Sequence, residues 1–362
     1  MRDPLSERLA ARTLELVDIA SESRAEQPLA EHVLAVLAGA GVPVRDAGDT
    51  CVLAGVTSPG ERPLVLLAGH FDTVPAQDNR PGHIAGDAVH GLGAADMKGA
   101  LAVMVELAID GPASDPAVDL GFVFFGREEL PHGDSALEPL LERERGLRRA
   151  ALAIVMEPTA NGLQAGCLGN INATWTFHGR SGHSARPWLA DNAIHRAAAG
   201  IAALAAVPPA VHDFGGLCFT EVASVTTIEG GIAANVIPDS ARAHVNYRYP
   251  PGMAPAQAEA RLHAMCDPHG ALTIDADAPS GPVPQDNPLL AALARTARVS
   301  LEAKQAWTPV AEFGAAGIDA VNFGPGDPPQ AHTRGEHVRI EALARSHRTL
   351  AAFATGRPVQ EA

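Results

Sequence analysis

His70 and Asp72 stand two residues apart in GHFDTVP (69–75), directly after the apolar run PLVLLA. The end of a buried strand is where many α/β enzymes place their reactive side chains. An imidazole at such a place can bind a metal ion or move a proton, although a lone histidine is more often structural. The role of the pair therefore depends on which other side chains the fold brings to it.

Further acidic and imidazole side chains follow the other apolar runs. VDLGFVFFG is followed by Glu128 and Glu129, ALAIVM by Glu157, and AVNFGPG leads into the loop of His332, while GLGAADMKG places Asp96 at the start of a helix. Alone, each is weak evidence, since glutamate pairs are usually solvated and Asp96 could be a simple N-cap. If the sheet is parallel, however, its strand ends share one rim, and these side chains converge there.

Several carboxylates on one rim would repel each other unless a cation joined them. Imidazole and carboxylate ligands without a thiolate suit Zn²⁺ or another borderline divalent ion, with Co²⁺ and Mn²⁺ left open. Two-metal hydrolases commonly share one carboxylate between their ions. We therefore expect His70 and Glu157 to bind one ion, Glu129 and His332 to bind the other, and Asp96 to bridge them.

Two residues of the same stretches remain without a ligand role. Asp72 is placed to fix the imidazole of His70, as acidic partners of metal-binding histidines do. Glu128 is then free to take a proton from water and return it to a leaving amine. These assignments predict a dinuclear amide hydrolase.

The bulk composition sets broad limits on the class of protein. The chain has 362 residues with 46% hydrophobic content, which suggests two domains. Its formal charge is −15 without a long basic run, which argues against nucleic-acid binding. No apolar stretch reaches the ~18 residues of a membrane span, and the N-terminus lacks a signal-peptide pattern. With four scattered cysteines, expected to be buried free thiols, these features predict a cytoplasmic protein.

Alternating helix and strand patterns predict an α/β domain with a largely parallel central sheet. From about residue 169 strand patterns predominate, and a Pro- and Gly-rich linker follows at 278–288. We expect residues 1–168 and 281–362 to form the α/β domain and 169–280 to form an inserted α+β domain. The expected helices lie near 5–20, 27–40, 97–110, 190–206, 255–266, 288–299 and 336–355. The expected strands lie near 63–69, 118–126 and 151–157, and in NATWTFHG, FTEVASVTTIEG, ARAHVNYRY, LTIDAD and IDAVNFG.

The chain resembles the M20 family of dinuclear zinc peptidases and deacylases nearly from end to end. The resemblance rests on GHFDTVP, GLGAADMKG, the Glu128–Glu129 pair, MEPT, GRSGHSARPWLADNAIHR, GGIAANVIPD and VNFGPGDPPQAHTRGEHV. It implies a zinc-peptidase-like catalytic domain, a homodimer formed through the inserted lid domain, and the metal and base roles assigned above. His183 then corresponds to the lid histidine that stabilises the tetrahedral oxyanion. Without the resemblance, His183 reads as an ordinary loop histidine.

The stretches HSARPWLADNAIHR and NFGPGDP point to the subgroup that hydrolyses N-succinyl-LL-2,6-diaminopimelate. Such a substrate carries carboxylates at both ends, so guanidinium partners are expected. Asn235 and Arg248 match substrate-contacting positions, and Arg186 and the backbone of the Gly324–Gly326 loop are further candidates.

Two departures from the family pattern leave the substrate preference open. Arg127 stands where an acidic residue is frequent, and Leu92 where a polar or basic one is. The alternatives are an acetylornithine deacetylase, another N-acyl amino acid hydrolase or a dipeptidase. A non-catalytic binding protein on the same fold would lack ligands or the base, and this chain has candidates for all of them.

Overall fold

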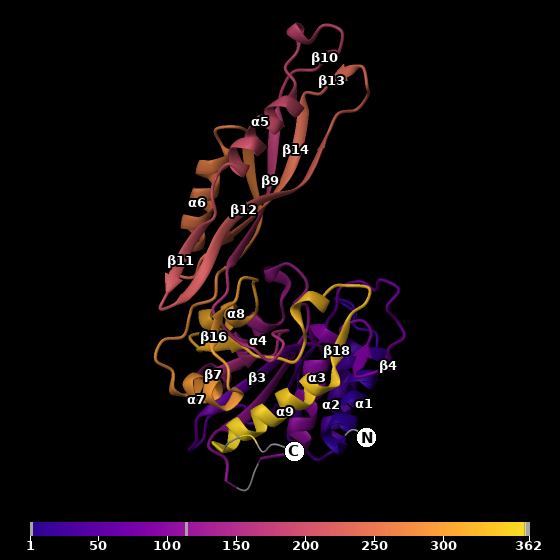
Figure 1. The fold of residues 1–362 in the computed structure, drawn as a ribbon, viewed down its shortest axis with the longest axis vertical. Helices are drawn as coiled ribbons and strands as arrows, with labels where there is room; N and C mark the ends of the chain where they lie inside the picture. Colours follow the sequence, from indigo (N-terminus) through magenta and orange to yellow (C-terminus); the bar gives the residue numbers. More distant parts are fainter. Residues whose placement is uncertain (1–2, 113–114, 358, 360–362) are drawn as a thin grey trace. The chain divides into compact units, whose positions relative to one another are not determined.

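The computed structural model describes residues 3–112, 115–357 and 359 and divides the chain into two compact units (Figure 1). The first unit comprises Met1–Gly166, Pro282–Lys304 and Thr308–Ala362. The second comprises Cys167–Gly281 and Gln305–Trp307. The second unit is thus inserted in the first along the chain. That it acts as a lid stays a prediction.

The first unit is built on an eight-stranded sheet in the order β1-β2-β6-β3-β7-β17-β8-β16. At its centre β3 pairs in parallel with β6 and β7, and β7 with β17, so the predicted mostly parallel sheet is confirmed. Every residue of β3 is buried, which explains its continuous apolar sequence. The antiparallel edge strands and the short β8 and β16 were not predicted. The strands are β1 Val44–Gly48, β2 Cys51–Gly55, β3 Leu64–His70, β6 Asp119–Phe125, β7 Leu152–Val155, β8 Leu163–Ala165, β16 Leu301–Ala303 and β17 Ala320–Asn322.

Helices α1, α3 and α9 pack against one another in this unit. Helix α1 begins where predicted, with Asp3 accepting the backbone N–H of Ser6 at 3.2 Å and Pro4 in the first turn. The helices are α1 Pro4–Asp18, α2 Gln27–Gly39, α3 Gly99–Asp110, α4 Leu137–Arg143, α7 Pro288–Ala297, α8 Val310–Ala315 and α9 Ile340–Thr355. Short helical turns lie at Ala94–Lys98, His132–Asp134, Leu147–Arg149 and Pro328–Gln330.

A small antiparallel sheet of three strands completes the first unit, in the order β18-β5-β4. Its strands are β4 His83–Ala85, β5 Ala88–His90 and β18 His337–Arg339. β4 and β5 were not predicted, because three residues are too few to show a period. The helix expected near 336–355 is wrong at its start, where β18 takes residues 337–339 and α9 begins at Ile340. The chain leaves β5 for the segment of Asp96 and enters β18 from the loop of His332. This sheet therefore anchors two of the predicted ligand segments.

The second unit is a five-stranded antiparallel sheet in the order β11-β12-β14-β9-β15. Alternating burial along β9 places Trp175 and Phe177 in its core, with Tyr247 of β14. The predicted strands and both helices are confirmed, and β10, β11 and β13 are additional. The elements are β9 Gly169–His178, β10 Gly182–His183, α5 Ala193–Ala205, β11 Ala210–Phe214, β12 Leu217–Gly230, β13 Val236–Ile237, β14 Ser240–Tyr249, α6 Pro255–Cys266 and β15 Ala271–Ala278; Pro187–Leu189 forms a short turn.

The expectation of buried cysteines holds for Cys51, Cys167 and Cys266 and is wrong for Cys218. All four are free thiols. Cys218 is exposed because it alternates on β12 with the buried Phe219, which takes the core-facing position.

None of the described helices combines the length and apolar character that a bilayer crossing demands.

Candidate metal centre

The parallel strands at the centre of the first unit bring their carboxyl ends together. His70, the last residue of β3, pairs in register with Phe125, the last residue of β6. Ala68 of β3 likewise pairs with Val155 at the end of β7. The residues that follow these strands therefore meet at one rim, as the strand-end argument predicts.

Five side chains at this rim form two overlapping groups. The ligand atoms of His70, Asp96 and Glu157 lie within 4.8 Å of one another, and so do those of Asp96, Glu129 and His332. Asp96 belongs to both groups, and each group has one imidazole. This is the division expected from the sequence, while the ligand roles themselves stay predictions.

The individual distances within the groups are short. Nε2 of His70 lies 3.2 Å from Oδ1 of Asp96 and 3.7 Å from Oε1 of Glu157. On the other side, Nε2 of His332 lies 2.9 Å from Oε1 of Glu129 and 3.5 Å from Oδ2 of Asp96. The carboxylate of Asp96 thus faces an imidazole on each side, which a simple N-cap would not do.

Asp72 is fully buried, and it makes contacts with other residues besides His70. Nδ1 of His70 lies 2.9 Å from the backbone carbonyl of Asp72 and 3.6 Å from its Oδ1, so the closer orienting contact comes from the backbone. The carboxylate itself accepts the backbone N–H groups of Glu128 at 2.9 Å and Glu129 at 3.0 Å, and the Ser23 hydroxyl at 2.9 Å. Asp72 therefore also fixes the backbone of the predicted base and ligand.

Crowding of charge shifts the titration of these groups. Burial and the nearby Asp96 raise the pKa of Glu157 to about 7. Burial and Glu157 raise the pKa of Glu128 well above its usual range. The hydrogen bond to Glu129 raises the pKa of His332 to about 9. For His70, burial lowers the pKa, but the Asp72 and Asp96 carboxylates outweigh burial and raise it. These carboxylates ionise together only with difficulty.

The same crowding agrees with a metal-binding role. Oε1 of Glu157 is buried and has no hydrogen-bond partner among the described residues, although His70 is close by. A buried carboxylate oxygen of this kind is costly unless a cation satisfies it. The imidazole and carboxylate donors also match the preference of Zn²⁺ and related ions. The residues present therefore fit two divalent ions.

Glu336 is a functional candidate that the sequence did not reveal. Its buried carboxylate accepts the backbone N–H of Gly93 at 2.9 Å and those of Ala95 and Asp96 at 3.0 Å each. These bonds fix the segment that carries Asp96. Glu336 lies within AHTRGEHV, but backbone partners leave no mark on the sequence, so its role was missed.

Gly324 and Gly326 lie against the same rim for reasons of packing. A Cβ on Gly324 would stand 2.2 Å from the Met156 carbonyl oxygen, and one on Gly326 would stand 2.2 Å from the Ala95 carbonyl oxygen. The N–H and C=O of Gly324 are both bonded within the fold, to Thr159 and Asn161. Close backbone approach thus accounts for both glycines, and their substrate contact stays a prediction.

Three predicted residues of the second unit lie close to one another. His183 of β10 pairs in register with Val236 of β13, and its Nδ1 accepts the Ala185 N–H at 3.1 Å. The Arg186 N–H donates to the His183 carbonyl at 2.8 Å, and the Ser184 N–H to the Asn235 carbonyl at 3.0 Å. His183 and Arg186 are exposed and therefore available to a ligand.

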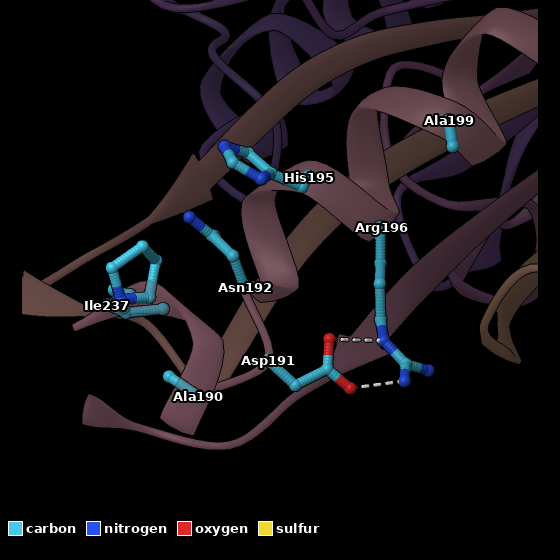
Figure 2. Close-up of a pocket in the computed structure, with 8 residues that line it drawn as sticks. Ala190, Asp191, Asn192, His195, Arg196, Ala199 and Ile237 are labelled. Carbon is cyan, nitrogen blue, oxygen red and sulfur yellow. Dashed lines mark hydrogen bonds and ion pairs between the residues drawn. The ribbon is translucent and has the colours of Figure 1, made fainter. Parts of the chain in front are cut away.

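Arg248 lies apart from this group, near the end of β14. Its Nε donates to Oδ1 of Asn246 at 2.9 Å, and burial lowers the pKa of its guanidinium. A hollow of ≈ 420 Å³ elsewhere in the unit is lined by residues of α5, by the preceding segment from Pro187, and by Ile237 of β13 (Figure 2). There Asp191 and Arg196 form an ion pair, so the lining charges satisfy each other.

The two departures from the family pattern have local explanations. Arg127 donates through Nη2 to Asp49 at 2.7 Å and through Nε to the Asp134 carbonyl at 2.7 Å. Its charge is thus held by residues outside the metal-ligand groups. Leu92 is buried and contributes to the core. Neither departure affects a predicted metal ligand or the predicted base.

Two imidazoles and three carboxylates meet beside the carboxyl ends of the parallel strands, in an α/β unit interrupted by an α+β unit. This is the arrangement of a metal-dependent hydrolase. The chain belongs to peptidase family M20/M25/M40, whose model matches residues 66–356. This confirms the family expected from the sequence.

Named relatives and a solved structure agree with this assignment. The chain is 39% identical over 334 residues to a Mycobacterium tuberculosis protein named as a candidate succinyl-diaminopimelate desuccinylase, covering 91% of this chain and 92% of the other. It is 33% identical over 339 residues to the succinyl-diaminopimelate desuccinylase of Corynebacterium glutamicum, with the same coverage. The fold matches an M20 family metallo-carboxypeptidase of Sulfolobus solfataricus with a TM-score of 0.78 at 16% identity, over 99% and 100% of the two chains.

Proposed function

We propose that the protein is a metal-dependent amidohydrolase that cleaves N-succinyl-LL-2,6-diaminopimelate to succinate and LL-2,6-diaminopimelate. The products would feed lysine and cell-wall synthesis. The observation that carries the chemistry is the Asp96 carboxylate, which lies between His70 and His332 in two overlapping groups of ligand atoms. The names of the 39% and 33% identical relatives support the substrate.

Five residues would hold two divalent ions. His70 and Glu157 would bind one ion, Glu129 and His332 the other, and Asp96 would bridge them. When bound, such ions lower the pKa of a water molecule and polarise an amide carbonyl. Zn²⁺ suits this donor set, and Co²⁺ and Mn²⁺ are the alternatives.

Glu128 is the proposed general base. It belongs to a third group of close ligand atoms with His70 and Glu129, but both metal groups are complete without it. Its backbone is held by Asp72, and burial and Glu157 raise its pKa, which suits a group that must accept and then donate a proton. Glu128 takes a proton from the attacking water and later gives it to the departing amine.

The second unit supplies the proposed substrate contacts. His183 stabilises the oxyanion, and Arg186, Asn235 and Arg248 bind the carboxylates of a small N-acyl amino acid. Guanidinium groups suit this task because their paired N–H donors match a carboxylate. We also propose that the inserted unit closes as a lid and forms a homodimer, as the family resemblance implies.

The test is amine release from N-succinyl-LL-2,6-diaminopimelate and N-acetylornithine, measured side by side with metal-stripped and Zn²⁺-loaded protein. Metal-dependent cleavage of the succinyl substrate alone is the expected result. Cleavage of N-acetylornithine instead would keep the mechanism and replace the substrate. Cleavage of neither by metal-loaded protein would refute the proposed activity.

A further inference from the structure

Three histidines stand in a row across the small sheet β18-β5-β4. His90 of β5 lies directly opposite His83 of β4 and His337 of β18 in the strand register. The His83 and His90 ring centroids are 5.0 Å apart at an interplanar angle of 10°, and those of His90 and His337 are 4.9 Å apart at 29°. We call these three residues the histidine row. None of them belongs to the metal groups described above, and in the present ring orientations their nitrogens do not all lie within 4.8 Å of one another.

The histidine row is on the accessible face of its sheet. The neighbouring row, Ile84, Val89 and Val338, points to the opposite face, where both valines are buried. His83 is exposed, and His90 and His337 are partly exposed. An ion in solution can therefore reach all three imidazoles.

The central imidazole of the row, His90, is disfavoured from taking a proton. Burial lowers the pKa of His90, and the charges that His337 and His83 would carry lower it further. Nδ1 of His337 lies 2.9 Å from the Gly335 carbonyl oxygen, to which it donates, so Nε2 is the ring nitrogen left for a ligand. Neutral imidazole with a free ring nitrogen is the form that binds metal ions.

We propose that His83, His90 and His337 bind one divalent transition-metal ion. It would be separate from the two ions proposed above for the metal groups and Glu128, which we call the hydrolytic centre. Imidazole ligands suit Zn²⁺, Cu²⁺ and Ni²⁺. Adjacent strands lie about 4.8 Å apart, so the outer two histidines stand about 10 Å apart at the backbone and can approach one point from either side of His90. The stacked rings must turn about their side-chain bonds to do so, which accessible side chains can do.

An ion at the histidine row would join the three strands of its sheet. β5 leads to the segment of Asp96, and β18 follows the loop of His332. Glu336, next to His337, holds the Asp96 segment through its backbone N–H groups. Glu336 and the strand pairing hold these segments without an ion, so the hydrolytic centre should survive loss of the proposed ion.

The test counts zinc by equilibrium dialysis at a fixed free Zn²⁺ concentration, followed by elemental analysis. The wild type is compared with His83→Ala, His83→Phe, His90→Phe and His337→Phe. Phenylalanine keeps a stacking ring but offers no ligand nitrogen, so it separates metal binding from ring packing. His178→Ala, an exposed histidine on β9, is the matched control.

Each histidine-row variant should bind one zinc ion fewer per chain than the wild type, and His178→Ala should bind the same number. His83→Ala and His83→Phe should also hydrolyse the substrate at the wild-type rate, because β4 carries no residue of the hydrolytic centre. Equal zinc content in all proteins would overturn the proposal, and so would retention of the ion in any one of the three phenylalanine variants. Loss of zinc together with hydrolysis in the His83 variants would also overturn it, because the lost ion would then belong to the hydrolytic centre.

Discussion

The Asp72 carboxylate accepts the backbone N–H of Glu128, with 2.9 Å between Oδ1 and the nitrogen. The same side chain accepts the N–H of Glu129 at 3.0 Å, and its backbone carbonyl lies 2.9 Å from Nδ1 of His70. One buried residue therefore positions a predicted ligand, the predicted base and a second predicted ligand. Burial raises the pKa of Asp72, but its interactions with His70 and these N–H groups outweigh burial and keep the carboxylate ionised.

Asp72→Asn should weaken zinc binding by about 10- to 100-fold, as changes next to metal ligands commonly do. The new amide N–H₂ would face a backbone N–H that needs an acceptor. Zinc affinity is measured by competition with a chromophoric chelator. Ser23→Ala, which removes only the hydroxyl donor to Asp72, should weaken binding far less. Equal affinities for Asp72→Asn and the wild type would refute this positioning role.

Glu128→Gln should lower hydrolysis by at least about 100-fold, the lower range of general acid–base catalysis. Its zinc content should stay near that of the wild type, because the two metal groups are complete without Glu128. Amine release and elemental analysis on the same preparation check both statements. Activity near the wild-type value would remove Glu128 as the base.

His332→Ala should reduce zinc content by one of the two ions of the hydrolytic centre. Nε2 of His332 lies 2.9 Å from Glu129 and 3.5 Å from Asp96. The substitution therefore removes one ligand from the group of Asp96, Glu129 and His332 and leaves the group of His70 complete. Equilibrium dialysis gives the stoichiometry, with His178→Ala as the control. An unchanged stoichiometry would rule out His332 as a ligand.

Glu336→Gln should lower the free energy of unfolding by about 1–3 kcal/mol, the cost of leaving buried partners of a charged group unsatisfied. The carboxylate accepts three backbone N–H groups, and an amide nitrogen in place of one oxygen cannot accept any of them. Urea unfolding of metal-free protein measures the difference. Glu341→Gln, on the exposed first turn of α9, should change little. Equal losses in the two variants would contradict a role specific to Glu336.

The stability of the protein should depend on pH through Glu312. Burial raises the pKa of Glu312 from 4.5 to about 7 and outweighs the neighbouring Ser135, which acts to lower it. Between these pKa values the folded state keeps a proton that the unfolded state has lost, so stability falls as pH rises through this range. The shift corresponds to about 3 kcal/mol.

Glu312→Gln should remove this dependence, because its side chain does not ionise. The free energy of unfolding of the variant relative to the wild type should therefore rise by about 3 kcal/mol from pH 4 to pH 8. Urea unfolding at several pH values measures it. Glu142→Gln, an exposed residue of α4, is the control and should show a small change. A flat difference between Glu312→Gln and the wild type would refute the prediction.

The sequence by itself determined the class of fold and the rim at which the chemistry lies. Long apolar runs such as β3 and β6 have too many buried side chains to be anything but interior strands, and amphipathic periodicity marks α1 and α9. Parallel strand ends must share one edge of a sheet, so the order of apolar runs and polar residues is enough to place His70, Glu129 and Glu157 together.

Only the tertiary structure decided how these side chains are held. The Asp72 carboxylate binds backbone N–H groups from another loop, and Glu336 binds three more around Asp96. Every residue except proline carries such an N–H, so the sequence does not indicate which ones a carboxylate will meet. The three-residue strands that align His83, His90 and His337 are likewise too short for a detectable period, and register arises only when distant segments pair.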